Sequence, residues 1–88
     1  MTCPHLTQPA TFTGPVASVA DGCPVCLAGG HADWVHLRQC LACGQVACCD
    51  SSPRRHASAH HAETGHPVVR SIEPGEHWRW CYVDEVLG

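Results

Sequence analysis

Apolar and polar side chains alternate along two stretches of the chain, residues 34–40 and 78–83. In the second stretch the aromatic residues Trp78, Trp80 and Tyr82 share one face. A period of two is typical of a strand whose two faces meet different surroundings. Two shorter runs next to turn signals favour further strands. The predicted strands therefore cover residues 34–40, 45–48, 68–72 and 78–83.

One helix is predicted between the second and third of these strands. Ser52 and Pro53 are the residue types preferred at the N-cap and at the first helical position. Gly65 suits the C-terminal cap, where a left-handed backbone is common. We therefore expect the helix to cover about residues 53–64, and a turn at residues 73–76 to lead into the last strand.

The first 22 residues have proline and glycine at short intervals and no sustained period. They predict an extended arm, held only at Cys3 and His5. Two Cys-x-x-Cys pairs, at residues 23–26 and 40–43, predict tight turns that present both sulfurs to one side. The expected fold is therefore a small α+β module, with a short twisted sheet, one main helix and long metal-tied loops.

Length and composition predict one domain, residues 1–88, with a thin apolar core. The chain has only five Leu, one Ile and one Phe. A domain of this size buries only about 60–65% of its unfolded surface, so such a core gives marginal stability. A bound structural metal adds roughly 10–16 kcal/mol of apparent binding free energy to folding. We therefore expect metal to compensate for the thin core.

The charge of the chain argues against binding to nucleic acid. Five Arg and no Lys stand against eight acidic residues, for a formal net charge of −3. Zinc bound by deprotonated thiols leaves the chain acidic, so general contact with a phosphate backbone is not expected. No apolar run is long enough to span a membrane, and residues 1–15 lack the pattern of a signal peptide. We expect a cytoplasmic protein that is monomeric and does not bind membranes.

Eight cysteines and eight histidines are the chemical signal of the sequence. Four disulfides in a secreted domain would explain the cysteines. They would not explain the interleaved histidines, and no signal peptide accompanies them. Thiolates and imidazoles in this order are the ligands of tetrahedral Zn²⁺. The sequence therefore predicts a zinc protein.

Spacing alone leaves the partners of the two Cys-x-x-Cys pairs open. Each pair needs two more ligands to complete a tetrahedron. His56 and His60 are one helical turn apart, and they could share an ion or serve neighbouring ions. Adjacent cysteines rarely both bind one ion. The candidates are Cys48, Cys49, His56, His60, His61 and His66.

Five segments carry most of the cysteines and histidines: CPH (3–5), CPVC (23–26), WVHLRQCLACGQVACCD (34–50), RHASAHHAETGHP (55–67) and WCYVDE (80–85). Together they resemble the UBP-type zinc finger, a domain of deubiquitinating enzymes, a cytoplasmic histone deacetylase and a ubiquitin ligase. The later part is particularly similar to the stand-alone bacterial branch of the family. The resemblance covers almost the whole chain.

The resemblance implies three zinc sites with a cross-braced order of ligands. In the third, an aspartate stands where the family has its last cysteine, and carboxylate oxygen is an accepted zinc ligand. The implied sets are Cys23, Cys26, Cys48 and His56 for the first site, Cys40, Cys43, His60 and His66 for the second, and Cys3, His5, Cys81 and Asp84 for the third.

The resemblance also implies recognition of a protein tail. Ubiquitin-binding members of the family take the free C-terminal Gly-Gly tail of ubiquitin into an aromatic pocket, where an arginine helps to hold it. Here Trp34, Trp80 and Tyr82 match aromatic positions, but the arginine position is Asp50. A carboxylate there would repel a C-terminal carboxylate. The candidates to take over the arginine's role are Arg55, Arg54, Arg38 and Arg79.

Two functional hypotheses follow, and neither is an enzyme, since four-ligand closed zinc sites are structural. The first is a module that binds a peptide tail in an altered pocket. The alternative is a zinc-stabilised adaptor that contacts a bacterial partner protein through its surface, with no binding of a ubiquitin tail.

Overall fold

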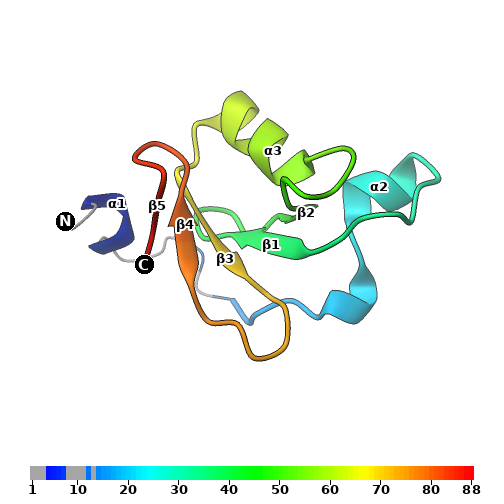
Figure 1. The fold of residues 1–88 in the computed structure, drawn as a ribbon, viewed down its shortest axis with the longest axis horizontal. Coiled ribbons are helices and arrows are strands. Elements are labelled where there is room, and N and C mark those ends of the chain that lie inside the picture. Colours follow the sequence, from blue (N-terminus) through cyan, green and yellow to red (C-terminus); the bar gives the residue numbers. More distant parts are fainter. Residues whose placement is uncertain (1–3, 8–11, 13) are drawn as a thin grey trace.

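A computed structural model describes residues 4–7, 12 and 14–88 (Figure 1). Its helical segments are short except for one, which lies between the second and third strands of a single sheet. This combination confirms the predicted α+β class. The helical segments are α1 (Pro4–Thr7), the 3₁₀ helix η1 (Val19–Asp21), α2 (Pro24–Ala28) and α3 (His56–Thr64).

The sheet is antiparallel throughout, with five strands in the order β2-β1-β3-β4-β5. Its register pairs Val69 with Trp80 and Arg70 with Arg79. Because successive side chains point to opposite faces, these two pairs lie on opposite sides of the sheet. The strands are β1 (Leu37–Cys40), β2 (Val46–Cys48), β3 (Val68–Ser71), β4 (Arg79–Cys81) and β5 (Val86–Leu87).

Different segments cover the two faces of the sheet. Helix α3 packs on β1 and β2 at one face, and α2 packs beside β2 (Figure 1). On the other side the N-terminal segment is tied to the β1 region by two hydrogen bonds. Phe12 N–H donates to the Leu41 carbonyl (2.9 Å), and Ala17 N–H donates to Oε1 of the buried Gln39 (3.1 Å).

The buried core is small and is centred on cysteine. One cluster joins Leu37 and Ile72 to three cysteines, and a second joins Leu6 and Val68 to Cys81. Cysteines therefore occupy the places that larger apolar side chains fill in bigger domains. The cysteines of the first cluster are Cys23, Cys26 and Cys48.

The predicted start of the main helix was wrong. Helix α3 begins at His56, after Arg55 in the left-handed conformation (φ 46°), and has no side-chain cap. Ser52 is buried and its hydroxyl accepts the Val35 N–H (2.8 Å), so it is not available as a cap. The predicted end is confirmed, because Gly65 has φ 74° and donates its N–H to the His61 carbonyl.

Other boundaries also differ from the prediction. The first and last predicted strands are shorter, and β5 was not predicted. The Cys23–Cys26 turn continues into α2, with Leu27 N–H donating to the Cys23 carbonyl (3.0 Å). The arm contains the short helical segments α1 and η1 within its described part. No helix among the described residues has the length and apolar character needed to cross a membrane.

Candidate metal centres and aromatic pocket

Three groups of Cys, His and Asp side chains converge in the described part of the chain. In each group the possible ligand atoms lie within 4.8 Å of one another. The groups combine residues that are far apart in the sequence. They are Cys23, Cys26, Cys48 and His56 (first group), Cys40, Cys43, His60 and His66 (second group), and His5, Cys81 and Asp84 (third group).

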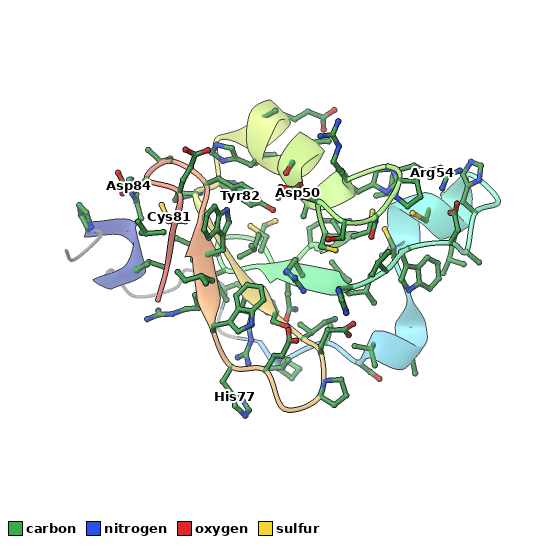
Figure 2. The ribbon with its side chains drawn as sticks, in the orientation of Figure 1. Asp50, Arg54, His77, Cys81, Tyr82 and Asp84 are labelled. Atoms are coloured by element: carbon green, nitrogen blue, oxygen red, sulfur yellow. The ribbon has the colours of Figure 1, made fainter. Side chains whose placement is uncertain are left out.

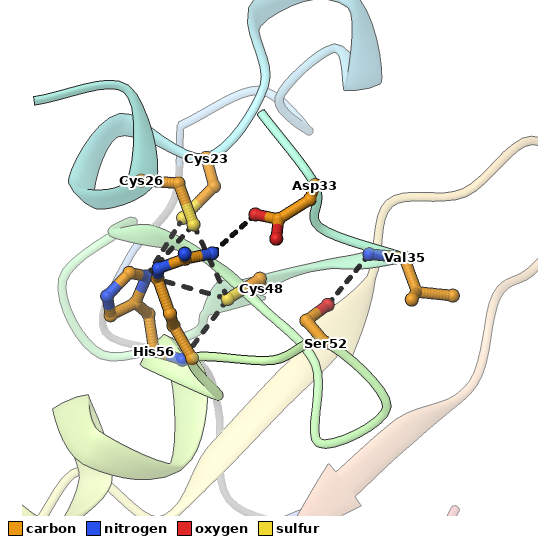
Figure 3. A network of polar contacts seen from close by, with 8 residues as sticks. Cys23, Cys26, Asp33, Val35, Cys48, Ser52 and His56 are labelled. Atoms are coloured by element: carbon orange, nitrogen blue, oxygen red, sulfur yellow. Dashed lines mark hydrogen bonds and ion pairs between the residues drawn. The ribbon is translucent and has the colours of Figure 1, made fainter. Parts of the chain in front are cut away.

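The first group joins the start of α2, the end of β2 and the start of α3 (Figure 3). His56 Nδ1 lies 3.5 Å from Cys23 Sγ, 3.3 Å from Cys26 Sγ and 3.5 Å from Cys48 Sγ. The Cys26 and Cys48 sulfurs are 3.9 Å apart. Usual zinc bond lengths give tetrahedral edges of about 3.6 Å for S···N and about 3.8 Å for S···S. The group therefore has the size of a tetrahedral zinc site.

The second group lies between the end of β1 and α3, and it is partly exposed at Cys43. The sulfur–nitrogen separations are 3.5 Å for Cys40–His66 and 3.4 Å for Cys43–His60, and the two ring nitrogens are 3.3 Å apart. A tetrahedral zinc site requires about 3.4 Å between two nitrogens. His60 presents Nε2 and His66 presents Nδ1 to the common centre. These four side chains also fit one ion.

Helix α3 links the first two groups, because His56 and His60 serve different ones. Spacing had left open whether the two histidines share an ion. Since Cys48 comes after the second Cys-x-x-Cys pair but joins the first group, the two groups are interleaved along the chain. Any ion in either group therefore fixes contacts between segments that are distant in sequence.

The third group ties α1 to the β4–β5 turn. His5 Nδ1 lies 3.1 Å from Asp84 Oδ2 and 3.5 Å from Cys81 Sγ. Cys81 Sγ and Asp84 Oδ2 are 3.8 Å apart. These are again edges of a tetrahedron around one ion. The expected fourth ligand, Cys3, lies outside the described residues.

Electrostatics within the first and second groups favours a cation. Burial and the sulfurs of Cys23 and Cys48 raise the pKa of Cys26 to about 12. Burial also raises the pKa of Cys40. Burial and the nearby His66 lower the pKa of His60, which keeps that imidazole neutral, as metal binding requires. A divalent cation is the group that would stabilise the thiolates. The Cys/His clusters can hold Zn²⁺.

Cys49 is not part of any of the three groups. Its side chain is buried and lies 3.6 Å from the Ser52 hydroxyl. Burial acts to raise the pKa of this thiol, but hydrogen bonds from Ser52 and the backbone, with the charge of Arg38, bring it below the ordinary value. The adjacent cysteines thus have different surroundings.

An open pocket of about 360 Å³ lies on the α3 side of the sheet, and we call it the aromatic pocket. The rings of Trp80 and Tyr82 stand at 87° to each other, with centroids 6.4 Å apart. The guanidinium carbon of Arg38 lies 4.4 Å from the centre of the Trp78 ring. The residues that define the pocket are Arg38, Cys49, Asp50, Trp78, Trp80 and Tyr82.

Asp50 and Tyr82 both line this pocket, beneath α3 (Figure 2). The Ser58 hydroxyl donates a hydrogen bond to Asp50 Oδ1. Burial raises the pKa of Tyr82, and the negative charge of Asp50 acts in the same direction. On its other side Tyr82 stacks on His61, with centroids 5.1 Å apart, and His61 Nδ1 lies 2.8 Å from the His66 carbonyl oxygen. The pocket wall is therefore in contact with the segment that carries the second group.

The structure brings together some of the residues expected at the peptide site but not all. Asp50, Trp80 and Tyr82 line the aromatic pocket, whereas Trp34 and Arg55 do not. Trp34 packs against the first cysteine-centred cluster instead, and its ring lies over Gly22.

Sequence reasoning missed Trp78 as a pocket residue and did not single out Arg38. Trp78 shares a strand face with Trp80 and Tyr82, so the period of two could have indicated it. Arg38 was only one of four candidate arginines. Its place follows from the pairing of β1 with β3, which the sequence does not specify.

Comparisons with known proteins agree with the fold and the metal groups. Residues 23–86 match the family "Zn-finger in ubiquitin-hydrolases and other protein". A solution NMR structure of a protein from Rhodopseudomonas palustris is similar, with 48% sequence identity and a TM-score of 0.79 over 99% of this chain and 80% of that one. The comparison with curated protein sequences gives no match. The chain belongs to the family of zinc fingers that occur in ubiquitin hydrolases and other proteins.

Proposed function

We propose that this zinc-binding module recognises the C-terminal tail of a protein partner in the aromatic pocket. Domains of this family are protein-interaction modules, and the ligand sets of the three groups would serve to hold the pocket in place. The observation that carries the proposal is the Arg38 guanidinium, which lies in the pocket wall beside the rings of Trp78, Trp80 and Tyr82.

Arg38 supplies the positive charge that an arginine provides at the Asp50 position in ubiquitin-binding members of the family. Its Nη1 donates to the Leu37 carbonyl (3.0 Å), and stacking on Trp78 holds the guanidinium plane. A guanidinium has five N–H donors, so others remain for a carboxylate ligand. The free Asp50 oxygen is an acceptor for backbone N–H groups of a tail. A tail of glycine residues suits such a pocket because it has no side chains.

On this proposal the protein acts as a binding module and catalyses no reaction. The first two groups each supply four ligands, which leaves no open position on a tetrahedral ion. Closed sites of this kind are structural.

Calorimetric titration of the zinc-loaded protein with a peptide ending in Gly-Gly tests the proposal. The free acid should bind, whereas the C-terminal amide should bind at least about tenfold more weakly, because a charged hydrogen bond contributes roughly 1.5–3 kcal/mol. Arg38→Gln should weaken binding of the free acid similarly. Arg54→Gln is the matched control, because Arg54 pairs with Asp33 outside the pocket.

Ubiquitin itself should be titrated in the same way. Asp50→Arg should raise the affinity for its free tail, since the substitution replaces a repelling carboxylate with a second guanidinium. Undetectable binding of both ubiquitin and the Gly-Gly peptide would overturn the tail proposal in favour of an adaptor that binds through its outer surface.

A further inference from the structure

A second concave site lies on the opposite face of the sheet, with a volume of about 450 Å³. We call it the basic pocket. Its size falls within the range of roughly 300–1,000 Å³ that is usual for small-molecule sites. The residues that matter for the argument are Phe12, Gln39, Leu41, Arg70, His77 and Arg79.

The charge of this pocket is one-sided. Arg70 and Arg79 are directly opposite each other on β3 and β4. Like charges at such positions destabilise a strand pair. Among the described residues the ion pairs are His5–Asp84 and Arg54–Asp33, so neither of these arginines is neutralised by a carboxylate. No acidic residue is among the described residues that line the pocket. An anion placed between the two guanidinium groups would relieve this repulsion.

The hydrogen-bond donors of the two arginines are also available. Arg70 uses Nε to donate to the Ser71 carbonyl (3.2 Å), and its terminal nitrogens have no acceptor in the described part of the chain. The Arg79 guanidinium has no acceptor there either. His77 adds an exposed imidazole at the same pocket. Guanidinium groups bind carboxylate and phosphoryl oxygens with paired hydrogen bonds.

Phe12 and Leu41 give the pocket an apolar wall, and nearby contacts hold this wall in place. The Phe12 ring packs so closely on Gly44 that a Cβ there would lie 2.5 Å from it. Gln39 is buried, accepts the Ala17 N–H (3.1 Å) and donates Nε2–H to the Gly44 carbonyl (3.2 Å). These contacts hold the arm against β1, with Phe12 beside Leu41.

We propose that the basic pocket binds a small organic anion. Its carboxylate or phosphoryl group would lie between Arg70 and Arg79, and its apolar part would contact Phe12 and Leu41. The site is separate from the aromatic pocket, because Arg70 and Arg79 point away from the face that carries Trp80.

Nuclear magnetic resonance titration of the zinc-loaded, ¹⁵N-labelled protein tests this inference. Phenyl phosphate and phenylacetate are the probes for the two oxyanions, and benzyl alcohol is the neutral control. At least one anion should give saturable shifts at the amides of Gln39, Arg70 and Arg79, and the alcohol should not. Arg70→Gln and Arg79→Gln should each weaken binding by about tenfold.

Arg54→Gln provides a control for the loss of one positive charge and should leave the affinity unchanged. The following results in these titrations would overturn the inference. They are the absence of saturable shifts with both anions, shifts confined to the aromatic pocket around Arg38, and equal weakening by Arg54→Gln. Inorganic phosphate that binds as tightly as phenyl phosphate would also contradict it, because the apolar wall would then contribute nothing.

Discussion

Substitution of Gly22 by alanine should destabilise the protein strongly, because two separate costs act at this position. Gly22 has φ 72° and ψ −169°, a region that is essentially restricted to glycine, and other residues there cost about 1–3 kcal/mol. A Cβ at Gly22 would lie 2.6 Å from Trp34 Cη2, which is well inside ordinary contact distance. Overpacking of this kind costs about 1–3 kcal/mol more. The expected total is about 2–6 kcal/mol.

Gly30 offers the matched control. It also has a left-handed φ, 78°, but no described atom lies within 4 Å of the Cβ position. Gly30→Ala should therefore cost only about 1–2 kcal/mol, the price of a left-handed backbone alone. Chemical unfolding at one fixed concentration of free zinc gives both values, since bound metal itself shifts stability.

A double substitution identifies the clash as the cause. In a Trp34→Leu background the ring is gone, so Gly22→Ala should keep only its backbone cost of about 1–3 kcal/mol, with a coupling of about 1–3 kcal/mol between positions 22 and 34. Equal effects of Gly22→Ala and Gly30→Ala in the native background would refute the reasoning. That result would mean that Trp34 does not pack over Gly22.

Two further predictions concern the adjacent cysteines Cys48 and Cys49 and the buried tyrosine Tyr82. Cys48→Ala should lower the zinc content by one ion per chain, whereas Cys49→Ala should leave it unchanged. Only Cys48 lies in a ligand group. Metal analysis that finds equal losses of zinc in the two variants would contradict this prediction. Tyr82 is the single tyrosine, and burial raises its pKa above 10.0. The stability that results from this raised pKa is fully present below pH 10, and it is lost as the pH rises through the pKa of Tyr82 in the folded protein. The alkaline loss of stability should be smaller in Tyr82→Phe, and an ultraviolet titration midpoint at or below 10 would refute the prediction.

The metal groups could be predicted from the sequence because zinc restricts both ligand type and spacing. The two Cys-x-x-Cys pairs fix half of each of the first two groups, and the family resemblance supplied the rest. The α+β class followed from the period of two along residues 34–40 and 78–83 and from the Gly65 cap.

The sequence-based predictions that differ from the structure concern features that depend on contacts between distant residues. Ser52 has the local chemistry of a helix cap, but its hydroxyl serves Val35. The two-residue strand β5 has too few residues to show a period, and it exists because it pairs with β4. Trp34 was expected at the pocket from the family resemblance, whereas the structure packs its ring over Gly22. Tertiary packing decided each of these cases.

The most direct test of the account is removal of the metal. The core is centred on cysteine sulfurs, and burial raises the pKa of the Cys26 thiol, so its ionised form needs a cation beside it. Exhaustive treatment with a chelator should therefore remove all the zinc and, together with it, the far-UV circular dichroism and the dispersed amide spectrum of the folded chain, and added Zn²⁺ should restore both. A folded spectrum that is unchanged in a sample shown to be free of metal would contradict the claim that zinc holds this protein together.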